Sequence, residues 1–267
     1  MPKYPFLGLG FNSWYQKFGT AEVAAELWTA AELGGVQLWL DASDASTITL
    51  NGSTVSQCDD KSGNNRHATQ ATASNQPTYT TAGLNGKNVL TFSNAGGTYL
   101  SIPGGTGDYF PYQSAFIVYS DTSTAAYTTA LGGRYVSSTR AAYHGHVDNS
   151  QIFDSSFTSA ETRNGDNFKN GTDIGDGTST ARPSTPAIFS FVATGQFDVD
   201  RRFQTIGADA SIPASRAITG LIAELILLEN AASAADRQKT EGYLAHKWGL
   251  TADLPSDHPY KSSAPTV

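Results

Sequence analysis

The sequence predicts an all-β fold, an antiparallel sandwich of two sheets with one short helix near the C-terminus. Three observations support it: short segments that alternate between apolar and polar residues, turn-forming pairs between them, and 26 Gly and 11 Pro in 267 residues. Strands joined by tight turns need such residues, whereas long helices exclude them. About ten or more short strands at this spacing are typical of a two-sheet sandwich.

The clearest strand covers residues 36–41, where Val36, Leu38 and Leu40 share one face. Further strands are expected at 54–58, 89–92, 99–102, 115–119, 126–131, 141–146, 187–193, 203–206 and 220–228. Asn-Gly pairs at 51–52, 85–86, 164–165 and 170–171 separate several of these segments and suit tight hairpins. The Gly- and Asn-rich stretch 158–184 predicts long hairpins or loops.

One helix is expected near the end of the chain. Ser233 and Asp236 form a capping-box pattern, residues 243, 244, 247 and 248 recur at helical spacing, and Gly249 follows as a stop. Trp39 and Trp248 are expected to be packing anchors. The polar tail, residues 251–267, predicts a surface strap or partial disorder.

Residues 1–33 differ from the rest and predict an N-terminal arm, followed by the domain at 34–250 and the tail at 251–267. Pro and Gly make the arm too irregular for a core of its own, with a short helix expected between Thr20 and Gly34. Its aromatic side chains need a surface to pack on, either their own domain or a partner subunit. The aromatic residues expected to dock are Tyr4, Phe6, Phe11, Trp14, Tyr15 and Phe18.

Charge and composition argue against several classes of partner. The net charge is -7 and no basic run occurs, which argues against nucleic acid and anionic membrane surfaces. No stretch approaches the ~18 apolar residues of a membrane span. Cys58 is the only cysteine, so no internal disulfide is expected. The first residues lack the apolar run of a signal peptide, so folding in a cytoplasm is expected.

Three stretches of the sequence resemble one family. They are residues 35–44 (GVQLWLDASD), residues 60–68 (DKSGNNRHA) with 84–92 (LNGKNVLTF), and residues 218–228 (ITGLIAELILL) with 237–249 (RQKTEGYLAHKWG). Together they resemble the laminin-G-like, concanavalin A-like jelly rolls of phage virion proteins and environmental bacterial surface proteins. The resemblance covers roughly residues 33–260 and implies a concanavalin A-like jelly roll; the first 30 residues have no counterpart in it.

The catalytic pattern of jelly-roll glycoside hydrolases is absent from the sequence. Those enzymes place two carboxylates on one strand in a Glu-x-Asp-x-x-Glu spacing. The nearest pairs here are Glu224 with Glu229, which an odd offset places on opposite strand faces, and Asp198 with Asp200, which lack flanking glutamates. No Gly-x-Ser-x-Gly elbow occurs either. The sequence therefore predicts that the protein is not an enzyme.

Calcium is the metal that the resemblance implies, held by loop carboxylates at an edge of the sandwich. The candidate ligands are Asp41, Asp44 and Asp60, and ordinary turn-forming aspartate is the alternative. His144 and His146 have a spacing that zinc uses, but no third ligand is evident. No other cofactor is expected.

Glycan binding on a jelly roll uses exposed aromatic rings beside polar groups. Tyr109, Phe110 and Tyr112 cluster in the loop 103–113 and are the candidate glycan-binding residues, with core or rim packing as the alternative. Three more tyrosines lie near expected strand ends: Tyr127, Tyr135 and Tyr143.

The resemblance and the aromatic arm favour a structural and adhesive protein of a bacteriophage particle, either a capsid decoration protein or a component of a tail fibre or spike. It would be found on the virion surface after assembly in the host cytoplasm. Expected partners are other virion proteins through the arm, cell-surface glycans, and further copies of the chain, with a trimer as the favoured oligomer. The alternative is a carbohydrate-binding lectin module of a bacterial surface protein, and a glycoside hydrolase is the third.

Overall fold

The computed structural model describes residues 26–103, 110–133, 141–145, 148, 150–197 and 199–267. Within these ranges the chain is mainly β, with 14 strands joined in one sheet and a single long helix. Every pairing between these strands is antiparallel, which confirms the all-β prediction. No helix among the described residues has the length and hydropathy needed to cross a membrane.

The strands are β1 (Val36–Asp41), β2 (Ile48–Asn51), β3 (Thr54–Cys58), β4 (Ala68–Thr69), β5 (Thr78–Leu84), β6 (Lys87–Phe92), β7 (Leu100–Ser101), β8 (Tyr112–Tyr119), β9 (Leu131–Gly133), β10 (Asp166–Lys169), β11 (Thr172–Asp173), β12 (Ala187–Phe197), β13 (Phe203–Ile206) and β14 (Gly220–Leu228). The α-helices are α1 (Ala160–Arg163) and α2 (Ala234–Trp248). Short 3-10 helices are η1 (Ala30–Glu32), η2 (Ala45–Thr47), η3 (Ala73–Asn75), η4 (Val199–Arg201), η5 (Pro213–Ser215) and η6 (Thr251–Asp253).

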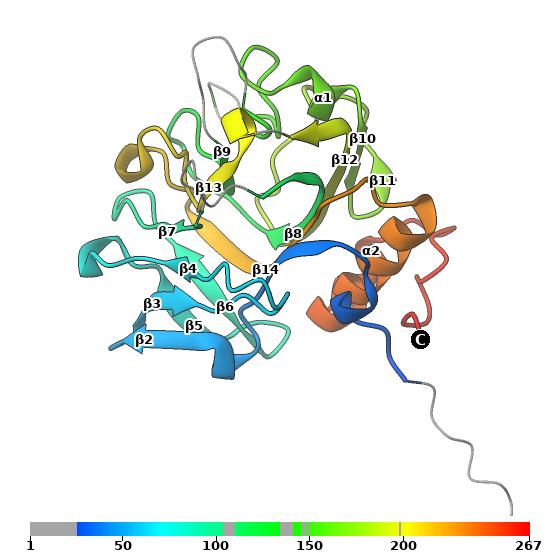
Figure 1. The fold of residues 1–267 in the computed structure, drawn as a ribbon, viewed down its shortest axis with the longest axis horizontal. Helices are drawn as coiled ribbons and strands as arrows, with labels where there is room; N and C mark the ends of the chain where they lie inside the picture. The colour runs from blue at the N-terminus through cyan, green and yellow to red at the C-terminus, as the bar shows by residue number, and fades with distance from the viewer. Residues whose placement is uncertain (1–25, 104–109, 134–140, 146–147, 149, 198) are drawn as a thin grey trace, which may run out of the picture.

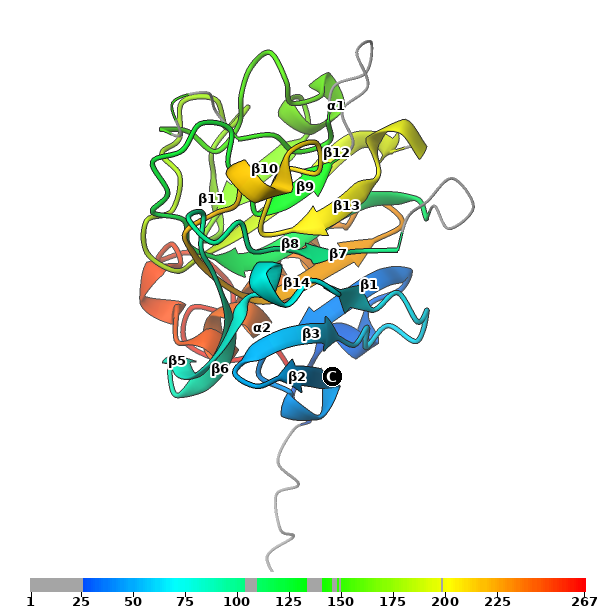
Figure 2. The same cartoon turned by 90° about the vertical axis from the view of Figure 1, so that its left-hand side faces the viewer.

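The sheet runs in the order β11-β10-β12-β8-β14-β6-β5-β3-β4-β7-β13-β9, with β1 also on β14 and β2 on β3. It is curled rather than flat: in Figure 1, β2 to β7 lie on one side, β10 to β12 on the other, and β8 and β14 run between them. The view in Figure 2 shows β13 and β9 folded over β8 and β14. A sheet curled in this way encloses a core between its own faces.

The central strands β8 and β14 are buried on both faces. Because side chains alternate along a strand, Ala115 and Ile117 face the first core, inside the curled sheet, and Phe116 and Val118 face the second. The second core lies beneath α2, which covers the outer face of the sheet (Figure 1).

Helix α2 begins and ends where the sequence predicts. Ser233 Oγ accepts a hydrogen bond from the backbone N–H of Asp236, which satisfies one free donor of the first turn. Gly249 has a φ of 72°, the left-handed conformation that glycine adopts most easily at a helix end. Trp248 is completely buried in the second core.

Residues 26–33, assigned by sequence to the arm, are part of the domain. Trp28 meets the ring of Tyr243 edge-on at 5.8 Å, and Ala30 is fully buried. The two ends of the described chain also pair: Leu27 and Thr266 form an antiparallel bridge beside α2. The residues expected to dock lie before residue 26, outside the described part of the chain. These are Tyr4, Phe6, Phe11, Trp14, Tyr15 and Phe18.

Two predicted strands are wrong. Residues 126 and 127 form a turn, residues 142 and 143 form a bend, and the loop after this bend approaches Thr128. A Cβ on Gly145 would lie 1.9 Å from the carbonyl oxygen of Thr128, so only glycine allows the two backbones to cross here. Strands β2 and β5 were not predicted, because their residues are largely polar or exposed and lack an apolar alternation.

Candidate functional site

A buried ion network lies between β1, β14 and α2. Its residues come from the stretches 35–44, 60–68, 218–228 and 237–249, which carry the family resemblance and are called the family-like stretches below. Glu224 accepts hydrogen bonds from Nε1 of Trp39 and Nε1 of Trp248, each at 2.8 Å. Nζ of Lys247 lies 2.7 Å from Glu224 and 2.7 Å from Asp41. Burial raises the pKa of Glu224, and the ammonium group of Lys247 opposes that rise. These residues hold α2 on the sheet, and both tryptophans are confirmed as packing anchors.

The three candidate calcium ligands are bonded to donors of the protein. Nζ of Lys61 lies 3.2 Å from Asp41 and 2.8 Å from Asp44, and its hydrogen bond lowers the pKa of Asp44 to about 2. Asp60 accepts the backbone N–H of Trp39 at 3.0 Å. A calcium ion would have to displace these donors. In the described ranges, no three His, Cys, Asp or Glu side chains are grouped to hold a metal.

Burial corrects the prediction that aromatic residues of the loop 103–113 bind glycans. Phe110 is 4% exposed and Tyr112 is 0% exposed. The ring of Tyr112 stacks on Phe203 at 4.6 Å, and its hydroxyl donates to the carbonyl of Arg201 at 2.6 Å. Neither ring can stack on a sugar from solvent, because both belong to the first core. Tyr109 lies outside the described residues.

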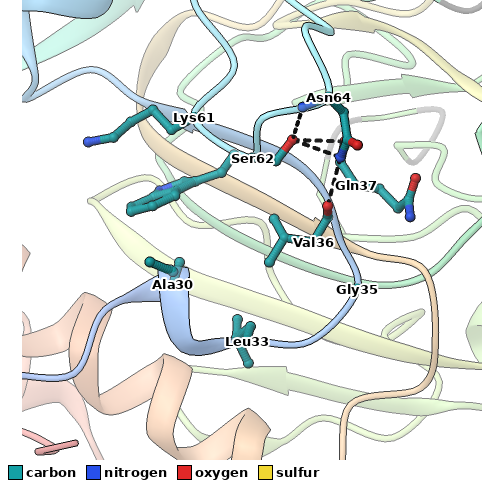
Figure 3. A pocket seen from close by; sticks show the side chains of 10 residues that line it. Ala30, Leu33, Gly35, Val36, Gln37, Lys61, Ser62 and Asn64 are labelled. Atoms are coloured by element: carbon teal, nitrogen blue, oxygen red, sulfur yellow. Dashed lines mark hydrogen bonds between the residues drawn. The ribbon is translucent and has the colours of Figure 1, made fainter.

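A hollow of about 470 Å³ lies beside β1, with Ala30 and Leu33 on its apolar side (Figure 3). Its polar groups are largely bonded to the protein. Nδ2 of Asn64 donates to the carbonyl of Val36 and to Oγ of Ser62, each at 2.9 Å. These bonds cover the edge of β1 that faces away from β14, a device that prevents pairing with other chains. We assign this hollow to the protection of an edge strand.

A second hollow, of about 310 Å³, is lined by half-buried aromatic rings and by polar side chains. Loops beside β9, before α1 and after β13 supply its lining, which comprises Tyr127, His144, Phe157, Ser211, Ile212 and Arg216. The half-buried rings of Tyr127 and Phe157 meet edge-to-face at 5.6 Å. The guanidinium of Arg216 lies 4.7 Å from the centre of the Tyr127 ring. We call this hollow the aromatic cleft.

Tyr127 has an unusual backbone. Its φ is 61°, a left-handed conformation that is strained for a bulky residue and often marks a functional site. The next residue is anchored. The Thr128 hydroxyl donates to Oδ2 of Asp121 at 2.9 Å, and Arg182 donates to the same carboxylate oxygen and to the Thr128 hydroxyl oxygen. Gly145 packs against the Thr128 carbonyl from the other side. This anchoring holds the Tyr127 ring in the cleft despite the strain.

Asp209 organises the polar side of the aromatic cleft. Its Oδ2 lies 3.1 Å from Nε2 of His144 and 3.0 Å from Nη1 of Arg216, and its Oδ1 accepts the N–H of Ser211 at 2.6 Å. Burial alone would raise the pKa of Asp209, but the hydrogen bonds from His144 and Ser211 outweigh it and lower the pKa to about 2. A buried carboxylate thus orients two rim side chains.

Sequence reasoning identified part of this cleft. Tyr127 and His144 were singled out, the first as an aromatic near a strand end and the second for zinc spacing with His146, which lies outside the described residues. His144 pairs with Asp209 instead. Phe157, Asp209 and Arg216 were missed because nothing in the sequence links loops so far apart. The one local signal is Asp209-x-Ser211, the spacing of a turn in which an aspartate accepts a backbone N–H.

Comparisons with known proteins assign no family to the chain. No protein-family model matches the chain, and no curated protein matches it. A solved structure that it resembles is the Trypanosoma rangeli sialidase in complex with sialic acid, at 13% identity and a TM-score of 0.49. The match covers 85% of this chain and 36% of the sialidase chain, so this chain spans about a third of that protein's length.

The match bears on one prediction. The sequence predicted a domain that is not an enzyme, and this prediction is withdrawn, because the solved structure reported above is an enzyme. At this level of similarity the match assigns no activity to the present chain.

Proposed function

We propose that this chain binds carbohydrate in the aromatic cleft. The observation that carries the proposal is the Tyr127 ring, which is half-buried, held in a strained backbone conformation and bordered by Phe157 and Arg216. Aromatic faces pack against the apolar faces of sugar rings, while nearby polar groups bond the hydroxyls. The volume of about 310 Å³ lies at the lower end for small-molecule sites, a size suited to one or two sugar units.

The donors of the cleft support the same ligand class. Arg216, fixed by Asp209, and the hydroxyl of Ser211 offer hydrogen bonds to a ligand, and Ile212, 47% exposed, extends the apolar surface. Binding sites of this kind combine apolar walls with a few placed polar groups. A sugar presents this same mixture of apolar C–H faces and polar edges.

The finer fold proposal is a concanavalin A-like jelly roll. It is supported by the curled antiparallel sheet with one internal core and by the meeting of the family-like stretches in one network around Glu224. In such a domain the variable loops carry binding, and the aromatic cleft is built from loops.

The biological setting we propose is an adhesive component of a virus particle, with residues 1–25 contacting other virion proteins and the cleft facing outward. The arrangement of the ends supports it: residues 26–28 pair with 265–267, and the C-terminal end lies on the far side of the domain from β9 and β13 (Figures 1 and 2). Immunogold labelling of intact particles from the source tests this setting. Labelling of cell envelopes instead of particles would favour a bacterial surface lectin.

A homo-oligomer, with a trimer favoured, stays part of this proposal, and light scattering of the purified full chain measures it. Calcium binding also stays a prediction. The aspartates named for it are bonded to a lysine and to backbone donors, which a calcium ion would have to displace. Equilibrium dialysis against calcium decides it directly.

A glycan array tests the proposed function. Wild-type protein should bind at least one class of glycan, and Tyr127→Gly should lose that signal, because glycine accepts the left-handed backbone while removing the ring. Tyr99→Ala is the matched control, a half-buried tyrosine that does not line the cleft. Silence of the wild type across neutral, acidic and sulfated glycans would contradict the proposal.

A further inference from the structure

Among the described residues of the aromatic cleft, Arg216 is the cation that is held in place and still carries unused donors. Its Nη1 is bonded to Asp209 at 3.0 Å, and its guanidinium lies over the Tyr127 ring at 4.7 Å. A guanidinium has five N–H donors in a fixed plane. Among the described residues, Asp209 is the only acceptor bonded to it, and the side chain is 26% exposed. Donors therefore remain for a ligand.

We infer that the aromatic cleft selects carbohydrates that carry a carboxylate group, such as uronic or sialic acid units, and that Arg216 binds that carboxylate. This inference rests on the proposed carbohydrate site. The planar guanidinium matches the two oxygens of a carboxylate, and such charged hydrogen bonds are roughly twice as strong as neutral ones.

The charges around the cleft point the same way. Among the described residues that line it there is no Asp or Glu, since Asp209 is 3% exposed and lies behind His144 and Arg216. Both ring nitrogens of His144 face oxygen acceptors, Asp209 at 3.1 Å and the carbonyl of Gly145 at 2.9 Å. Within the described lining, an entering anion therefore meets donors and no carboxylate, whereas an entering amino sugar meets the Arg216 cation.

The overall charge of the protein does not prevent this selectivity. The net charge is -7, but at physiological salt exposed charges more than ~8 Å apart are largely screened. At contact distance the ligand meets the Arg216 guanidinium, whose planar donors remain available although Asp209 offsets part of its charge. Arg216 also lies over the Tyr127 ring, so a ligand that packs beside this ring is within reach of the guanidinium.

Calorimetric titration with matched oligosaccharides tests the inference. The probes are tri-galacturonic acid, its neutral methyl ester, and a sulfated galactose trisaccharide, each added to the full chain. We expect the acid to bind at least tenfold more tightly than the ester, and Arg216→Gln to remove this preference by weakening binding of the acid far more than binding of the ester. Arg216→Lys should keep part of the preference. Lys239→Gln on α2 makes the same charge change away from the cleft and should alter neither affinity.

The outcomes separate this inference from the proposed function. Equal binding of acid and ester, a stronger preference for sulfate, or an equal loss of both ligands in Arg216→Gln would overturn the inference and leave carbohydrate binding standing. If neither these probes nor a glycan array reveals any ligand for the wild type, the proposed function itself fails. Should Arg216→Gln not fold, the wild-type comparison of acid with ester and the Arg216→Lys variant still decide.

Discussion

Nε2 of His144 lies 3.1 Å from Oδ2 of Asp209, the same oxygen that binds Arg216 at 3.0 Å. One buried carboxylate therefore connects the loop beside β9 with the loop after β13. The two loops are far apart in sequence, and this connection gives the aromatic cleft its polar wall. The stability of the cleft should accordingly depend on the charge of Asp209.

Asp209→Asn should lower the free energy of unfolding by about 2 kcal/mol at pH 7, because hydrogen bonds to a charged group contribute about 1.5–3 kcal/mol. The folded-state pKa of about 2 lies below the unfolded value of roughly 3.9, so this stabilisation is complete above about pH 4 and is lost as pH falls through 2. Thermal unfolding of both proteins from pH 2 to pH 7 measures it. A difference in Tm that stays constant across this range would contradict the assignment.

Lys247→Met should be strongly destabilising, by about 3–5 kcal/mol, because it leaves Glu224 and Asp41 buried without their shared cation. Lys61→Met is the control in the same network: its side chain is 23% exposed, and the loss should be about 1 kcal/mol or less. Urea unfolding of the two variants compares them. Equal losses would show that the ion network does not hold α2 on the sheet.

Tyr127→Gly should be more stable than Tyr127→Ala by roughly 1 kcal/mol, since a φ of 61° strains alanine but not glycine. Both variants should bind the best glycan at least tenfold more weakly, because truncating a central aromatic contact commonly costs ~2 kcal/mol. Chemical denaturation gives the first comparison and calorimetry the second. If alanine were the more stable variant, the strain at this position would not exist.

Deletion of residues 2–25 should leave the melting temperature of the domain nearly unchanged. Deletion of residues 2–33 should lower the free energy of unfolding by about 3–5 kcal/mol or more, because it removes the buried Trp28, Ala30 and Leu33 from the second core. Scanning calorimetry of the two truncations distinguishes the boundaries. Equal melting temperatures of the two truncated proteins would show that residues 26–33 do not stabilise the domain.

Local patterns predicted what depends on near neighbours. The capping box at Ser233 and the stop at Gly249 define α2 because capping bonds join residues only a few positions apart. The alternation in residues 36–41 marks β1, although Trp39 on the other face is buried as well, beneath α2. The sequence could not show that this strand is covered on both sides.

Contacts between residues far apart in sequence determine the burial and partners of several side chains, and sequence patterns could not predict them. Tyr112 looked like an exposed platform, but Phe203 and Arg201, about ninety positions away, place it in the core. The sequence around Asp41 suggests a calcium ligand but does not show that Lys247 reaches this carboxylate from the far end of the chain. The aromatic cleft depends on the same kind of contact.

The central claim is that a carbohydrate binds in the aromatic cleft, and a crystal structure of the protein with its best oligosaccharide from the glycan array tests it most directly. The account predicts a sugar ring within about 4.5 Å of the rings of Tyr127 and Phe157, the distance of an apolar contact. A sugar found in the hollow beside Trp39, or anywhere outside the cleft, would contradict it.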